Sequence, residues 1–172
     1  SGDLPEYLHI SEGNVHEVNI LKNLTLEKGT IIAVDIGLVD YEMFEKWTKD
    51  GVYFVSRLKT NARYETIKTN VLLQNRPILK DEIIKMTGTF TENKCPSELR
   101  IVESWDENKK ENIVFLTNNL HFGATTIADI DRERWQIEIF FKTIKQNLKI
   151  KTFIGTSKNA VLIQIWSALI CL

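Results

Sequence analysis

The chain has 172 residues, of which 43% are hydrophobic, enough for one globular domain with a substantial core but too few for two comfortable ones. Lys and Arg number 22 against 23 Asp and Glu, so the net charge of -1 gives no indication of a nucleic-acid-binding protein. The two cysteines, Cys95 and Cys171, do not have the spacing of a zinc site, and two are too few for a disulfide framework. This cysteine usage is typical of a reducing compartment, so a cytoplasmic protein is predicted. The longest apolar run, residues 160–172, is too short to span a bilayer, so no membrane partner is expected.

The first elements are predicted from short local patterns. "PEYLHIS" at 5–11 indicates a strand, and "NVHEVNILKNL" at 14–24 indicates a helix with Asn14 as its N-cap. "TIIAVDI" at 30–36 is a continuous run rich in β-branched residues, which is typical of a strand buried on both faces of a parallel sheet.

A helix and a second buried strand follow this run. "DYEMFEKWTKDG" at 40–51 predicts a helix that Asp40 caps and Gly51 ends, and "VYFVSRLK" at 52–59 predicts a strand. Strand, helix and strand within about thirty residues form a βαβ unit, so a parallel sheet flanked by helices is expected.

Residues 60–120 differ from the preceding βαβ pattern. They contain short runs in which apolar and polar residues alternate, separated by polar turns. Four strands are predicted here, and "WDENKKEN" at 105–112 resembles a hairpin connection between the last two. The predicted fold is therefore α/β, a mixed sheet flanked by helices within a single domain, with an inserted antiparallel β region at about 60–120.

A long amphipathic helix is predicted from Asp129, its expected N-cap, to residue 148. At about 100° per residue the apolar side chains form one stripe, which comprises Ile137, Phe140, Phe141, Ile144 and Leu148. By the same arithmetic Arg134, Glu138 and Lys145 fall within about 40° of one another at its border. Two interpretations stay open: solvated ion pairs at i,i+4, or a carboxylate that binds a divalent metal between cations that bind phosphates.

The segment "RERWQIEIFFKTIKQNL" resembles the C-terminal signature of DDE transposases of the bacterial insertion-sequence-four class, in which arginine, glutamate and lysine have the spacing of Arg134, Glu138 and Lys145. "IIAVDIGLVDYEMFEKWTKDGVYFVSRLKTN" resembles the second-aspartate region of the same family, and "LPEYLHISEGNVHE" the strand and turn before it. The resemblance covers nearly the whole chain in the right order.

This resemblance implies an RNase H-like fold in which three carboxylates bind two Mg²⁺ or Mn²⁺ ions and cut and join DNA at transposon ends. Asp35, at the end of a parallel strand, would be the second aspartate, and Glu138 the glutamate. Asp35 by itself could equally be a capping residue at a strand exit. The resemblance also implies phosphate contacts from Arg134 and Lys145, with Lys142 and Lys149 close by, and a homodimer in the active complex.

Three further residues have two interpretations each. Arg57 and Lys59 follow a predicted strand, where a solvated face is the default and phosphate contact is the alternative. The simplest role for Trp135 is packing against other side chains. Because it is one helical step from Arg134, it could also stack on an extruded base.

Several positions depart from the family pattern. Asp131 stands where the signature has tyrosine, which places a negative charge where DNA would approach, and Ile36 and Leu38 replace the arginine and tyrosine that usually flank the glycine. The family's first catalytic aspartate would lie upstream of Ser1, as would its DNA-binding region, so the chain alone is expected to be inactive. The alternatives are a non-catalytic DNA-binding remnant of a degenerate transposase and an unrelated RNase H-like nuclease.

Overall fold

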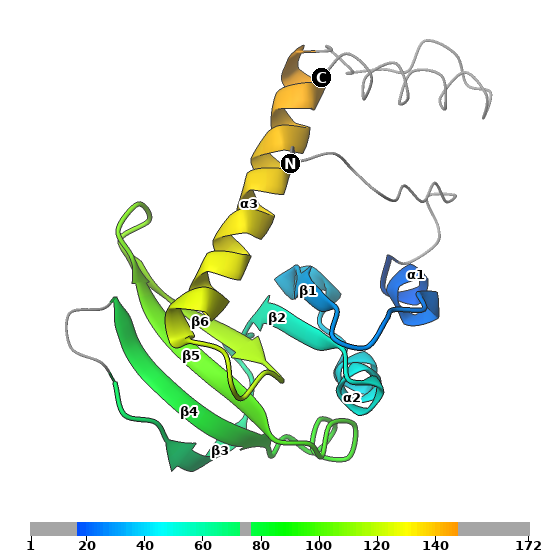
Figure 1. Ribbon diagram of the computed structural model, residues 1–172, viewed down its shortest axis with the longest axis vertical. Coiled ribbons are helices and arrows are strands. Elements are labelled where there is room, and N and C mark those ends of the chain that lie inside the picture. The colour runs from blue at the N-terminus through cyan, green and yellow to red at the C-terminus, as the bar shows by residue number, and fades with distance from the viewer. Residues whose placement is uncertain (1–16, 73–76, 148–172) are drawn as a thin grey trace. The chain divides into compact units, whose positions relative to one another are not determined.

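The computed structural model describes residues 17–72 and 77–147 (Figure 1). The chain divides into two compact units, the first ending at Arg132 and the second beginning at Glu133. In the first unit the helix α1 (Glu17–Asn23) precedes a sheet of six strands, and the long helix α3 (Ala124–Asn147) begins in this unit and continues into the second.

The predicted βαβ unit is confirmed. β1 (Ile31–Val34) and β2 (Tyr53–Arg57) are parallel neighbours, and α2 (Tyr41–Asp50) connects them. Asp40 is the N-cap of α2, since its Oδ1 accepts a hydrogen bond from Met43 N–H at 3.0 Å. Gly51 ends the helix with φ 73°, a left-handed conformation that glycine adopts without steric cost.

The antiparallel region predicted at about 60–120 is also confirmed. Its strands are β3 (Tyr64–Thr69), β4 (Ile78–Met86), β5 (Leu99–Asp106) and β6 (Glu111–Thr117). β5 and β6 form the expected hairpin, and β6 pairs antiparallel with β2, so the strand order is β1-β2-β6-β5-β4-β3. One mixed sheet thus joins the βαβ unit to the antiparallel strands, as an α/β fold requires (Figure 1).

The sheet has an apolar core on each face. The first core surrounds α2 and includes Phe44, Trp47 and Phe54, with the rings of Phe44 and Phe54 stacked at 3.9 Å between centroids. The second core includes Val55 and Ile127, so the beginning of α3 packs on the opposite face. The neighbouring residues Phe54 and Val55 of β2 therefore pack in different cores, because successive side chains of a strand point to opposite faces of the sheet.

Two predictions about these elements are wrong. α3 begins at Ala124 rather than near Asp129, and Asp129 lies inside the helix, where it pairs with Arg132 at 2.8 Å. β1 was expected to be buried on both faces, but of its residues only Val34 is buried, and Ile31 is 43% exposed. Among the described strands β1 lies at the edge of the sheet, which explains this exposure.

Some predictions fall outside the described residues: the strand at 5–11, the N-cap Asn14 and the apolar run at 160–172. The side chains of the apolar stripe of α3 also lie outside them. Within the described segments, no helix combines the length and apolar character needed to cross a membrane.

Candidate active site

Asp35 directly follows β1 and turns the chain into the 3-10 helix η1 (Ile36–Leu38). Its Oδ1 accepts a hydrogen bond from Gly37 N–H at 2.8 Å, so the capping role considered from the sequence is present. A Cβ at position 37 would lie 3.1 Å from the same oxygen, closer than most side chains tolerate. Glycine at this position therefore leaves room for the Asp35 carboxylate.

The register of the parallel strands brings Asp35 and Arg57 to the same edge of the sheet. Val34, the last residue of β1, is paired with Ser56, so Asp35 directly follows the carboxyl end of β1 and Arg57 is the last residue of β2. Asp35 keeps an extended backbone, with φ -63° and ψ 145°. Because side chains alternate along an extended chain, both residues belong to the sheet face of the second core, the face on which α3 begins.

Arg57 forms a partly buried ion pair with Asp131 of α3. Its Nε donates to Asp131 Oδ2 at 3.1 Å and its second terminal nitrogen donates to the same oxygen at 2.6 Å. The Asp131 side chain is 4% exposed and that of Arg57 23% exposed. The pair ties the end of β2 to the third turn of α3, entirely within the first unit.

This pair corrects the interpretation of Asp131. The sequence suggested that Asp131 places a negative charge where DNA would approach, but the residue is 3% exposed and its charge is paired with a guanidinium. Arg57 likewise does not lie on a fully solvated face. A charged hydrogen bond of this kind inside the protein is stronger than one on the surface, because the local dielectric is low.

The remaining predicted residues are less fully described. Lys59 is partly exposed in the turn after β2, where its carbonyl accepts from Ala62 N–H at 3.0 Å. On α3, Arg134 is partly buried and Trp135 is 40% exposed. Lys149 lies outside the described residues, as do the side chains of Glu138, Lys142 and Lys145.

The convergence of Asp35 and Glu138 stays a prediction. Asp35 belongs to the first unit and Glu138 to the second. Within the described parts of the chain, no three His, Cys, Asp or Glu side chains form a group that could hold a metal ion. Asp35 nevertheless has the donor chemistry that Mg²⁺ and Mn²⁺ prefer, a carboxylate whose two oxygens can accept several bonds.

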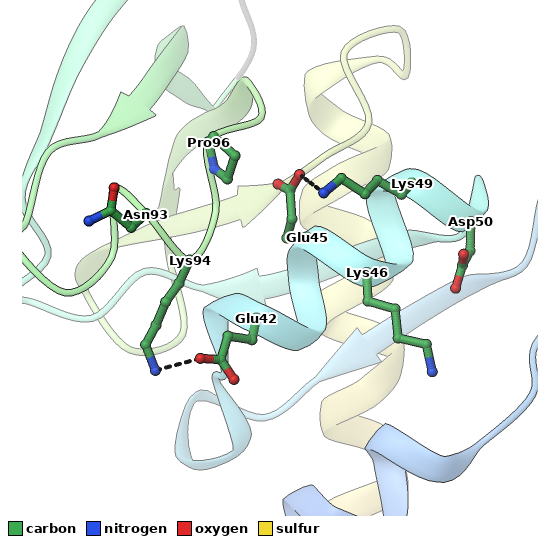
Figure 2. A pocket seen from close by; sticks show the side chains of 8 residues that line it. All are labelled: Glu42, Glu45, Lys46, Lys49, Asp50, Asn93, Lys94 and Pro96. Atoms are coloured by element: carbon green, nitrogen blue, oxygen red, sulfur yellow. Dashed lines mark ion pairs between the residues drawn. The ribbon is translucent and has the colours of Figure 1, made fainter.

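A separate surface pocket lies between α2 and the segment before β5 (Figure 2). Four of its charged side chains form ion pairs: Lys94 with Glu42 at 2.9 Å, and Lys49 with Glu45 at 3.1 Å. Three carboxylates and three ammonium groups line it, so their charges cancel and neither a metal nor a phosphate is favoured there. Its lining includes none of the residues predicted for the site.

Two polar clusters that sequence reasoning missed link elements of the sheet. The Asn118 side chain accepts from Phe54 N–H at 2.9 Å and donates to Val52 O at 2.8 Å, which bridges β2 to the end of β6. Arg100 and Asp81 form a buried two-fold hydrogen-bonded pair across β4 and β5, at 2.7 and 2.6 Å. Arg100 also donates to Phe122 O at 2.6 Å, just before α3.

Comparison with known proteins places the chain in a family. The family model described as the transposase DDE domain matches residues 1–172. A protein of Sinorhizobium fredii named as a transposase is 28% identical, over 98% of this chain and 48% of its own length. Proteins named as transposases for insertion sequence elements in Geobacillus stearothermophilus and Synechocystis are 29% and 28% identical and are covered over 44% and 48% of their lengths.

The chain therefore spans about half the length of the curated relatives it matches. The match extends over β1 and the Asp35 that follows it, the antiparallel strands and the helix that carries Glu138. The chain belongs to the transposase DDE domain family.

Proposed function

We propose that this chain is the catalytic portion of an insertion-sequence transposase with an RNase H-like fold, in which Asp35 and Glu138 are metal-binding carboxylates. In the whole protein it would hydrolyse the DNA backbone at the ends of the element and join those ends to a target. The observation that carries the proposal is the place of Asp35, at the carboxyl end of a parallel strand beside a second one. Open α/β sheets place their sites at this edge.

The metal would be held by the Asp35 and Glu138 carboxylates together with a further carboxylate, which the family pattern places before the strand of Asp35. When bound, Mg²⁺ or Mn²⁺ supplies activation of a water or a 3′-hydroxyl and stabilises the charge that develops on phosphate oxygens. The Gly37 N–H directs the Asp35 carboxylate through the hydrogen bond at 2.8 Å. The absence of a side chain at Gly37 keeps the space beside that carboxylate open.

Cations on α3 and shortly after it in the sequence would hold the DNA backbone. Arg134, Lys142, Lys145 and Lys149 recur at helical spacing around position 138, and side chains of this type neutralise phosphates without reading sequence. Lys59, in the turn after β2, is a further candidate for such a contact. Trp135 is 40% exposed, an accessibility compatible with stacking on a base.

Cleavage of DNA by the protein as its gene encodes it tests this proposal. The substrate is the DNA that flanks the coding sequence in its native locus, and the reaction is run with Mg²⁺ or Mn²⁺. Asp35→Asn and Glu138→Gln should each reduce cleavage by about a thousandfold or more, since each removes a charged ligand. The matched controls Asp50→Asn, on α2, and Glu133→Gln, on α3, replace exposed carboxylates and should leave cleavage unchanged.

Retention of cleavage by both Asp35→Asn and Glu138→Gln would overturn the proposal. An unchanged protein that binds this DNA but does not cut it would instead identify a non-catalytic DNA-binding protein. Cleavage without preference for the flanking DNA would favour a nuclease.

A further inference from the structure

Arg57 is held both at its backbone and at the head of its side chain. As the last residue of β2 it pairs with Phe115 of β6, and directly after it Leu58 N–H donates to Val114 O at 2.8 Å. Its guanidinium donates through Nε and Nη2 to one carboxylate oxygen of Asp131, at 3.1 and 2.6 Å. A long side chain that is held at both ends has lost most of its rotamer freedom before any ligand arrives.

The two hydrogen bonds to Asp131 leave one edge of the guanidinium unused. They take up the N–H of Nε and one N–H of Nη2, while the N–H groups of Nη1 make no hydrogen bond within the part of the chain that the structure describes. In those same residues every buried side-chain nitrogen or oxygen has a hydrogen-bond partner, so Nη1 must be in contact with solvent. The edge formed by Nη1 and Nη2 is therefore open to a ligand from solution.

This open edge has the chemistry and the location of a phosphate-binding group. Two parallel N–H groups of a guanidinium match two oxygens of a phosphate, which a single ammonium group does not. Arg57 ends a parallel strand at the same edge of the sheet as Asp35, and open α/β sheets bind their ligands at this edge. For a protein that acts on DNA, the matching ligand is a phosphate of the DNA backbone.

Asp131 is placed to keep the guanidinium in one orientation. Asp131 is 3% exposed, and Ile127, about one turn before it on α3, is fully buried in the second core. Both residues belong to the first unit, as does Arg57. Because this part of α3 is packed on the sheet, the carboxylate oxygen that accepts from Arg57 has little freedom to move. The guanidinium is thus oriented before DNA binds.

We propose that Asp131 is a positioning residue, which holds the guanidinium of Arg57 so that its Nη1–Nη2 edge binds a phosphate of the DNA backbone. The inference rests on the proposed function, because it names the part of the DNA that this edge of the sheet receives. A carboxylate near a phosphate repels it, but this carboxylate orients the cation that binds the phosphate. Orienting one long side chain in advance strengthens binding by about three- to tenfold, because the cost of fixing it is not paid on binding.

DNA binding without a metal tests the proposal. The protein as its gene encodes it is titrated, in the presence of EDTA, against a fluorescein-labelled duplex of the DNA that flanks its coding sequence, and anisotropy is recorded at several salt concentrations. Arg57→Gln should weaken binding and make the slope of log K against log salt shallower by about 1, as loss of one phosphate contact requires. Asp131→Ala should weaken binding by about three- to tenfold, and the isosteric Asp131→Asn should weaken it in the same direction.

The sign of the Asp131 effect separates orientation from charge. Removal of a carboxylate near DNA would strengthen binding if charge alone mattered, whereas loss of orientation weakens it. Asp129→Asn is the matched control, because it removes an exposed carboxylate that pairs with Arg132 on the same helix, and it should not weaken binding. When Arg57→Gln is already present, Asp131→Asn should cause no further weakening, because the guanidinium on which Asp131 acts is gone.

Ile127→Val separates the orientation of Arg57 from the packing of α3. This change removes a buried methylene group from the second core but leaves both charged side chains, so it should lower the melting temperature and leave the affinity and the salt slope unchanged. Arg57→Lys keeps the charge without the planar fork, so it should keep the slope but recover only part of the affinity. Thermal unfolding shows which variants are folded at the assay temperature, and only those are compared.

Each part of the proposal has an outcome that contradicts it. Unchanged or stronger binding in Asp131→Asn would overturn the positioning role, and an unchanged slope in Arg57→Gln would overturn the phosphate contact. A slope that Ile127→Val changes as much as Arg57→Gln does would assign the effect to the packing of α3 instead. These failures leave the proposed function intact, because cleavage is tested separately through Asp35→Asn and Glu138→Gln. Failure of the unsubstituted protein to bind this DNA would contradict both.

Discussion

Individual charged residues in this protein are buried with their partners. Asp81 and Arg100 are 6% and 5% exposed, and Asn70 donates a further hydrogen bond to Asp81 at 2.9 Å. Burial raises the pKa of Asp81, but the hydrogen bonds from Arg100 and Asn70 and the charge of Arg100 outweigh it, so the pKa lies below its usual value. A carboxylate whose pKa is lowered by folding stabilises the folded state at every pH at which it is ionised.

Asp81→Asn should lower the free energy of unfolding by about 3 kcal/mol near neutral pH, because it leaves the Arg100 guanidinium buried without an anion. Since folding lowers the pKa of Asp81, the stabilisation is present above the pKa of the unfolded chain, about 4, and is lost as the pH falls through the lower folded value. The difference between Asp81→Asn and the unsubstituted protein should therefore shrink in acid.

Urea denaturation near pH 7 and near pH 3 measures this difference. Glu107→Gln, which replaces an exposed carboxylate in the β5–β6 turn, is the control and should change stability by less than about 0.5 kcal/mol. Equal stability of Asp81→Asn and the unsubstituted protein at neutral pH would show that the pair is not required.

Elements with strong local signals were predictable from the sequence. Asp40, the apolar positions of residues 41–50 and Gly51 define α2 within one short segment, and the structure has this helix with those caps. The position of Asp35 at the end of a parallel strand was predictable for the same reason, because the βαβ pattern is local. The pairing of Arg57 with Asp131 was not, since it depends on residues 74 apart.

The start of α3 shows why local signals can mislead. Asp129 is a favourable N-cap residue, but the helix extends back to Ala124 because Ile127 is buried in the second core. Tertiary packing therefore overrides the capping preference, and Asp129 pairs with Arg132 on the helix surface instead. The exposure of Ile31 in β1 has a similar origin, since strand order within a sheet is not encoded in one segment.

Asp40 has two roles at the element scale that substitutions can separate. It caps α2 through Met43 N–H and pairs with Lys22 of α1 at 2.6 Å. Asp40→Ala removes both roles and should lower the free energy of unfolding by about 1 kcal/mol more than Asp40→Asn, which keeps a capping oxygen. Chemical denaturation compares the two variants. Equal losses in both would mean that the ion pair, and not the cap, carries the contribution of Asp40.

At the scale of the whole molecule, the net charge of -1 means that the proposed DNA binding would depend on locally grouped cations. Arg134, Lys142 and Lys145 of α3 occupy positions within about 80° of one another around the helix axis, and Lys149 follows four residues later in the sequence. Such a group adds a salt-dependent affinity even when the total charge is balanced.

The salt dependence of DNA binding should therefore show how many of these four residues contact phosphates. If all four contact phosphates, log K against log salt has a slope of about -3.6, and each single Lys→Gln change makes the slope shallower by about 1. Fluorescence anisotropy at several salt concentrations measures it. Lys68→Gln, in the exposed edge strand β3, is the matched control and should leave the slope unchanged. If the slope is unchanged in Lys142→Gln and in Lys145→Gln, these two residues do not contact DNA phosphates.

The strand order of the sheet also affects how the chain folds as it is synthesised. β2 emerges early, but its partner β6 follows only after β3, β4 and β5, and Val55 then pairs with Thr117. Until then the β2 edge presents unpaired backbone groups, the kind of edge that promotes aggregation of nascent chains. Closing this loop of about sixty residues is entropically costly and slow compared with local pairing. The β2–β6 junction thus joins the βαβ unit to the antiparallel strands, and we expect its formation to be the slow step in assembly of the sheet.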